Sequence, residues 1–119
     1  MLVVRSAACR EITANDGCRL RELFNPAHDQ SGLSYSLALA VVAPGQATHP
    51  HWLEQHEVYY TVRGRGRMHI GDEVAELSAG DSVVIPPRAR QWIENLGEEA
   101  LEFIALVSPP WRAQDDHRA

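Results

Sequence analysis

Apolar and polar residues alternate along much of the chain with the period of two that is typical of β-strands. In residues 35–41 the large apolar side chains occupy the odd positions, while serine and alanine occupy the even ones. This alternation stops before Pro44-Gly45, a dipeptide that favours a turn. Similar segments follow, and further strands are predicted at Thr48–Trp52, Glu57–Arg63, Arg67–Ile70, Glu73–Leu77, Ser82–Ile85, Gln91–Asn95 and Leu101–Val107.

Turn-forming residues separate these predicted strands. Gly71-Asp72 is the clearest two-residue hairpin, because it lies between two alternating segments. No segment has a convincing amphipathic helical period, and the residues before Ser34 carry no helix-turn-helix pattern. Many short strands separated by turns predict an all-β sandwich or closed barrel.

The last predicted strand, Leu101–Val107, is apolar on both of its faces. In so small a protein, the outer face of such a strand needs a cover, which either the N-terminal segment or a second subunit can supply. A homodimer is the simpler of these arrangements, and we expect one. The charged tail, from about residue 109 to 119, is predicted to be loosely held, except at Trp111.

Length and composition narrow the class of protein further. The 119 residues fit a single domain, 1–119. The net charge of −5 and the absence of a long basic run argue against nucleic acid as a partner. No apolar run is long enough to span a membrane. Because Cys9 and Cys18 lack a metal-binding spacing and the N-terminus does not look like a signal peptide, we expect a cytoplasmic protein with reduced thiols.

Histidines and carboxylates are concentrated in HPHWLEQHEVYY, residues 49–60, which contains three of the six histidines. Five residues in and around this segment have the spacing of the first sequence motif of the cupin superfamily: Gly45, His51, Leu53, Glu57 and Gly64. That motif has a glycine, His-x-His, a glutamate and a second glycine. The segment 45–64 therefore resembles this motif, with Leu53 at the position of its second histidine.

A second segment, 80–95, resembles the other cupin motif. Five residues have the spacing of this motif: Gly80, Pro86, Arg88, Gln91 and Asn95. Two of them differ from it, because the motif has glycine at the position of Arg88 and histidine at the position of Gln91. The resemblance implies a jelly-roll β-barrel, a fold that cupins share with other double-sheet proteins. It also implies one divalent metal ion inside the barrel, held by three histidines and a glutamate.

We predict how this chain could replace the two missing ligands. Side chains two residues apart on a strand point to the same side, so His49 could substitute for the lost histidine next to His51. The predicted metal ligands are therefore His49, His51, Glu57 and Gln91, with Tyr59 lining the same pocket. Such ligands suit zinc, iron, manganese, nickel or copper, and the spacing does not choose among them.

Two other histidines are predicted to lie outside this site. His56 does not keep the interval from the motif glutamate to Gly64, and it should lie in a turn or on the surface. His69 lies between Met68 and Ile70, whose apolar side chains should face the interior, so His69 should face outward.

The resemblance implies two main functions, and the sequence leaves both open. The first is a metal-dependent enzyme that acts on a small oxygen-rich metabolite by dioxygenase, isomerase, lyase or cyclase chemistry, with Glu57 and Tyr59 as catalytic residues. The alternative is a non-catalytic cupin with a degenerate metal site, in which His51, Glu57 and Gln91 form hydrogen bonds in a pocket that binds a small molecule. Burial would then raise the pKa of Glu57. A purely structural dimer is a third possibility.

Overall fold

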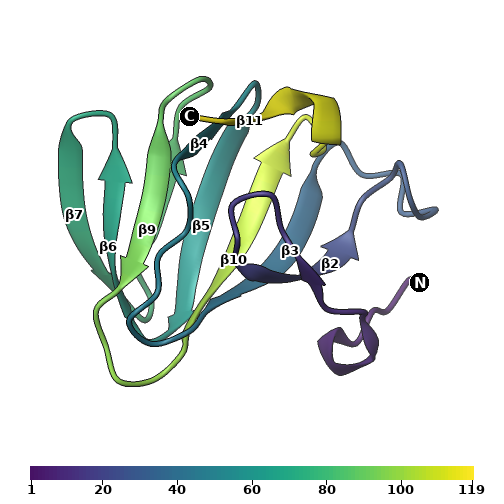
Figure 1. Ribbon diagram of the computed structural model, residues 1–119. Helices are drawn as coiled ribbons and strands as arrows, with labels where there is room; N and C mark the ends of the chain where they lie inside the picture. The colour runs from purple at the N-terminus through teal and green to yellow at the C-terminus, as the bar shows by residue number, and fades with distance from the viewer.

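The computed structural model describes residues 1–119 as two antiparallel β-sheets that face each other in a jelly roll (Figure 1). Each sheet combines strands from distant parts of the chain. In the six-stranded sheet the order is β1 (Ile12–Thr13), β2 (Arg19–Phe24), β3 (Ser36–Val42), β10 (Leu101–Ser108), β5 (His56–Arg63) and β8 (Ser82–Ile85). In the five-stranded sheet it is β11 (Asp116–Arg118), β4 (His51–Leu53), β9 (Gln91–Asn95), β6 (Arg65–Ile70) and β7 (Glu73–Ser78). The 3-10 turns η1 (Ser6–Ala8) and η2 (Ala113–Asp115) complete the structure.

The structure confirms the all-β prediction and most of the predicted strands. β8 and β9 have the predicted bounds. The hairpin between β6 and β7 turns at Gly71-Asp72, where Ile70 pairs with Glu73 and Gly71 has a φ of 56°. Such a left-handed φ favours glycine, and this is why the dipeptide predicted the turn.

The N-terminal segment contains two strands that the sequence analysis did not predict. β1 and β2 form a hairpin in which Ile12 pairs with Leu20, and β2 continues the six-stranded sheet beside β3. The turn of this hairpin contains Asp16 and Gly17, and Gly17 has a φ of 89°. β1 has only two residues, which is too short for an alternation of side chains to be visible in the sequence.

The C-terminal tail is also more ordered than predicted. Instead of being loose, it forms η2 and then β11, which pairs antiparallel with β4 (Figure 1). The indole Nε1 of Trp111 donates a hydrogen bond to Asp116 at 3.0 Å, and His117 stacks on Trp52 with ring centroids 4.1 Å apart. These contacts explain why a charged segment stays attached to the barrel.

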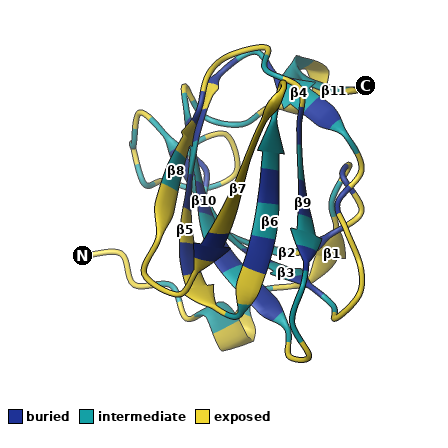
Figure 2. Ribbon diagram, turned by 90° about the vertical axis from the view of Figure 1, so that its left-hand side faces the viewer, coloured by how far each residue is buried: buried dark blue, intermediate teal, exposed yellow.

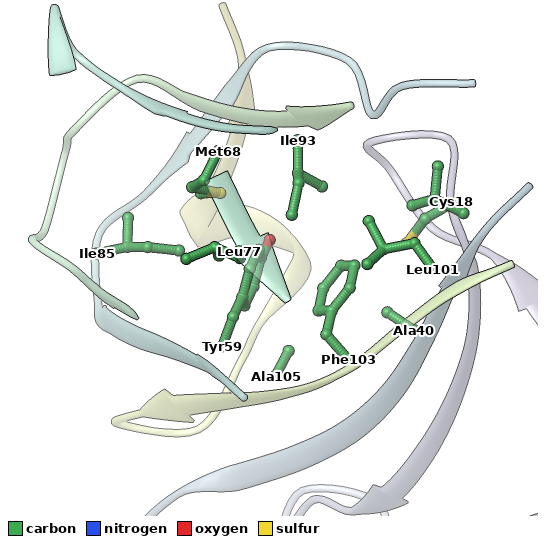
Figure 3. Packing of buried hydrophobic residues seen from close by; sticks show 11 residues of the cluster. Cys18, Ala40, Tyr59, Met68, Leu77, Ile85, Ile93, Leu101, Phe103 and Ala105 are labelled. Atoms are coloured by element: carbon green, nitrogen blue, oxygen red, sulfur yellow. The ribbon is translucent and has the colours of Figure 1, made fainter. Parts of the chain in front are cut away.

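The interior of the barrel is divided between a packed apolar core and a cavity. The core residues include Met68, Ile93, Leu101 and Phe103, each at most 1% exposed (Figure 3). Tyr59 joins this cluster, with its ring 4.3 Å from that of Phe103. Towards β2, β3 and β4 the side chains become smaller and more polar, and the interior there is not filled.

The outer face of the six-stranded sheet is apolar and only partly covered. Ile104 and Leu106 on β10 are half-buried, whereas Tyr60 and Val62 on β5 and Val84 on β8 are exposed by 45–62% (Figure 2). The expected homodimer would bury this face, and it stays a prediction. No helix in the structure has the length and apolar character that crossing a bilayer requires.

Candidate ligand-binding cavity

A cavity of about 280 Å³ lies between the six-stranded sheet and the N-terminal hairpin, β4 and the tail. Its floor is formed by small side chains, because Ala38 on β3 is paired directly with Ala105 on β10. The even positions of residues 35–41, which carry serine and alanine, therefore point inward and leave space. Fourteen of the 22 lining residues are hydrophobic, so the cavity suits a compact and mostly apolar molecule.

A chain of hydrogen bonds connects three of the predicted site residues. The hydroxyl of Tyr59 donates to Oε1 of Gln91 at 3.0 Å, and Nε2 of Gln91 donates to Oε1 of Glu57 at 2.9 Å. All three residues are buried, at 3%, 0% and 6% exposure respectively. Glu57 and Tyr59 line the cavity from β5, and Gln91 joins them from β9 on the opposite sheet. The amide of Gln91 thus bridges the two sheets through its hydrogen bonds.

Burial changes the ionisation of Glu57. The pKa of its carboxyl group is raised from 4.5 to about 8, chiefly by desolvation and also by the nearby charges of Asp16 and Asp116, although the hydrogen bond from Gln91 acts to lower it. Glu57 is therefore mostly protonated at neutral pH. In this form Oε1 accepts from Gln91, and Oε2 can donate its proton in a hydrogen bond.

His51 lies in the same cavity but contacts a different partner. It is 3% exposed, and its Nδ1 lies 3.0 Å from the carbonyl oxygen of His49. Because a carbonyl only accepts, this nitrogen carries the ring proton, and Nε2 keeps its lone pair in the neutral ring. The Nε2 atom lies 3.8 Å from Oδ2 of Asp16, which is beyond hydrogen-bonding distance.

The structure does not bring His49 into the site. The residue is exposed and does not line the cavity. Its backbone nitrogen donates to the carbonyl oxygen of Asp16 at 2.6 Å, and its ring packs over Gly17, where an added Cβ would lie 2.8 Å from Nε2. Pro50 follows, and β4 begins only at His51, so the alternation from which an inward His49 was predicted is interrupted. His49 instead holds the hairpin turn in place.

The other departures from the cupin motifs also have a structural place. Leu53 is 3% exposed and lines the cavity at the position of a metal-binding histidine, where it offers no ligand atom. Arg88 has a φ of 65°, the left-handed conformation that the motif glycine would adopt without strain. His56 and His69 lie where predicted, since His56 is exposed and His69 stacks on Trp92 outside the barrel.

The arrangement of these residues does not fit a bound metal ion. No three histidine, cysteine, aspartate or glutamate side chains are grouped so that they could hold one. The amide oxygen of Gln91, its only atom suited to a hard cation, already accepts from Tyr59. Of the predicted ligands, only His51 and Glu57 line the cavity. The site resembles the degenerate, hydrogen-bonded alternative more closely than a metal centre.

Asp16 is the residue of this site that the sequence analysis missed. It is 7% exposed and lines the cavity from the hairpin turn, together with the neighbouring Cys18. Desolvation, reinforced by Asp16, raises the pKa of the Cys18 thiol far above its usual range, so that thiol stays protonated. The signal in the sequence is Asp16-Gly17, a dipeptide that favours a hairpin turn. Asp116, from the tail, lines the cavity as well.

Comparisons with known proteins agree with this fold. The sequence model described as the cupin domain matches residues 38–107. An uncharacterised protein of Methanocaldococcus jannaschii is 37% identical over 102 residues, which cover 84% of this chain and 80% of that protein. Gentisate 1,2-dioxygenase of a Haloferax species is 35% identical over 73 residues, which cover 61% of this chain and 20% of that enzyme.

Among solved structures, a mutant of Bacillus subtilis oxalate decarboxylase superposes with a TM-score of 0.82 at 22% identity. The superposition covers 96% of this chain and 31% of the decarboxylase chain. The chain therefore spans less than a third of that enzyme, and at this identity the likeness concerns the fold alone.

Proposed function

The chain belongs to the cupin family, and from this premise we propose that it binds a small, mostly apolar molecule inside the barrel without a resident metal ion. The observation that carries the proposal is the Gln91 amide, which joins Glu57 to Tyr59 beside the cavity. These hydrogen bonds satisfy Tyr59, Gln91 and protonated Glu57 without a metal ion.

The size of the cavity limits the ligand. An engineered apolar cavity of about 150 Å³ in another protein holds benzene. A space of about 280 Å³ therefore accommodates a single ring with a short substituent, or an aliphatic molecule of similar volume. Burial of such a body against Phe103, Leu53 and Val107 would supply the main driving force of binding.

The polar groups of the cavity would orient the ligand rather than transform it. Protonated Glu57 can donate a hydrogen bond to a ligand oxygen through Oε2, while its other oxygen remains bonded to Gln91. The hydroxyl of Tyr59 is already engaged by Gln91 and stays protonated, because desolvation raises its pKa well above the ordinary value. Tyr59 is therefore not an activated nucleophile or base near neutral pH.

A metal-dependent enzyme acting on an oxygen-rich metabolite is the second candidate. It is favoured by the positions of His51 and Glu57, which match the first cupin motif, and by the relative named gentisate 1,2-dioxygenase. For this function Gln91 would have to release Tyr59, and a third strong ligand would have to enter the cavity. The donor atoms present do not fit this requirement, and we derive no reaction step from it.

Metal content and ligand binding distinguish the two functions. We expect protein purified without a histidine tag to contain less than stoichiometric zinc, iron, manganese, nickel and copper by elemental analysis. We also expect it to bind small aromatic alcohols in the presence of a chelator. Stoichiometric metal that is lost in Glu57→Ala would refute the proposal and favour the enzyme.

A pair of alanine variants locates the binding. Ala38→Leu places a larger side chain in the cavity and should abolish binding while the protein stays folded. Ala7→Leu, on the exposed η1 turn, adds the same atoms at a residue that does not line the cavity and should leave binding unchanged. Equal binding by both variants would show that the ligand lies elsewhere.

A further inference from the structure

We propose that the ligand carries a protonated amine, which binds between Asp16 and His51, and that the cavity excludes carboxylates. This inference rests on the proposed function, because it names the chemical class of the molecule that the same cavity takes. It follows from the charges that line the cavity and from two acceptor atoms, on the buried residues Asp16 and His51, that lie 3.8 Å apart on its lining.

Apart from His51, the titratable groups of the cavity are acidic. Its lining contains the carboxyl groups of Asp16, Glu22, Glu57 and Asp116, and it contains neither lysine nor arginine. An anionic ligand would lose its hydration without gaining a cationic partner, and at short distance from these carboxylates it would be repelled. The cavity therefore selects for neutral or positively charged ligands.

Two of these carboxylates are already fully engaged within the protein. Glu22 contacts Nδ1 of His28 at 2.6 Å with one oxygen and accepts from Asn25 at 3.3 Å with the other. Asp116 accepts from Asn15 and from Trp111, each at 3.0 Å. Neither side chain has an oxygen left without a donor.

Asp16 differs from them. Its Oδ1 accepts from the backbone nitrogen of Cys18 at 3.1 Å, the Cys18 thiol is also hydrogen-bonded to the carboxylate, and Oδ2 lies toward His51. This residue is 7% exposed, so a charged donor that reaches Oδ2 from the cavity would bind a carboxylate largely shielded from water.

The second acceptor is Nε2 of His51. Since Nδ1 donates to the carbonyl of His49, Nε2 presents a lone pair to the cavity from a residue that is 3% exposed. It lies 3.8 Å from Oδ2 of Asp16, too far for a direct hydrogen bond between the two side chains. An ammonium group has three N–H donors, so a single one can satisfy both acceptors and neutralise the carboxylate at the same time.

Three probes of similar shape test the proposal: 2-phenylethylamine, 2-phenylethanol and 3-phenylpropanoate. Their dissociation constants are measured by calorimetry at pH 7 with a chelator present. We expect the amine to bind roughly tenfold or more tightly than the alcohol, because a hydrogen bond to a charged group exceeds a neutral one by that order. The carboxylate should not bind measurably.

Variants place the amine at Asp16. Asp16→Asn keeps the acceptor for Cys18 and removes the charge, so the amine should lose its advantage while the alcohol binds as before. His51→Phe removes the second acceptor without adding a polar group, and it should also reduce the preference for the amine. Asp72→Asn makes the same chemical change in the β6–β7 hairpin, away from the cavity, and should leave the preference intact.

The outcomes separate this inference from the proposed function. If the alcohol binds but the amine gains nothing, or if Asp16→Asn retains the preference, the inference is wrong and the proposed function stands. If the carboxylate binds best, the inference is also wrong. If none of the three probes binds, both the inference and the proposed function fail.

Discussion

Replacing Glu57 with glutamine should remove a large pH dependence from the stability of this protein. The substitution keeps an oxygen at the position of Oε1, so the hydrogen bond from Gln91 can persist. It removes only the ability to ionise. Because Glu57 is 6% exposed, its ionisation in the folded state would place a charge in the barrel interior.

The sign and size of the effect follow from the pKa values in the two states. Glu57 ionises near pH 4.5 in the unfolded chain and at about 8 in the folded protein. Below pH 4.5 it is protonated in both states, and its full contribution to stability is present. Between these values the folded state keeps a proton that the unfolded state loses, so the free energy of unfolding falls by about 1.4 kcal/mol per pH unit. Over the whole interval this amounts to about 5 kcal/mol, a large part of the stability of a typical domain.

Urea unfolding of the wild type and of Glu57→Gln at pH 5, 6, 7 and 8, with a chelator present, measures this effect. All other ionisable groups are the same in the two proteins, so the difference between the two free energies of unfolding isolates Glu57. Relative to the variant, the wild type should lose stability steadily as the pH rises towards 8, and the difference should level off above pH 8.

A constant difference between pH 5 and 8 would refute the reasoning, because it would mean that Glu57 is ionised in the folded state throughout. A wild type that gains stability relative to the variant as the pH rises would refute it as well.

Three further predictions concern other parts of the molecule. Arg88→Gly should raise the free energy of unfolding by about 1 kcal/mol. Glycine removes the strain of the left-handed conformation at residue 88, and this gain exceeds the loss caused by a more flexible unfolded chain; a lower urea midpoint would contradict this. Asp116→Ala should lower it by about 1–2 kcal/mol, since Trp111 and Asn15 both lose their acceptor, and an unchanged melting temperature would show that these bonds contribute nothing. Light scattering should show a dimer for the wild type and a monomer for Ile104→Lys, which places a charge on the apolar outer face; a monomeric wild type would rule out the homodimer.

The barrel was predictable from the sequence because its central strands obey simple rules. Gln91–Asn95 alternates buried and half-buried residues along its whole length, and its bounds were predicted correctly. The motif glycines and Gly71-Asp72 located the turns, since their backbone conformations disfavour other residues. These signals are local, and a single sequence contains them.

The site was predicted less well, because its geometry depends on contacts between distant segments. His49 was expected inside the barrel, but Pro50 interrupts the strand and the backbone of His49 pairs with the N-terminal hairpin. Asp16 was missed because its place beside His51 results from the packing of that hairpin over β4. The sequence showed that Gln91 stands at the position of a histidine in the motif. It did not show that Gln91 accepts a hydrogen bond from Tyr59.

Ala38 and Ala105, which are paired on the adjacent strands β3 and β10, offer a way to change the size of the cavity. Both residues lie within long, fully paired strands, so their backbone is held by neighbours on either side. Larger or smaller side chains at these two positions would change the volume of the cavity, while the backbone of the two sheets keeps its conformation. Under the proposed function, substitutions at these two positions alone would give a series of variants that bind ligands of graded size.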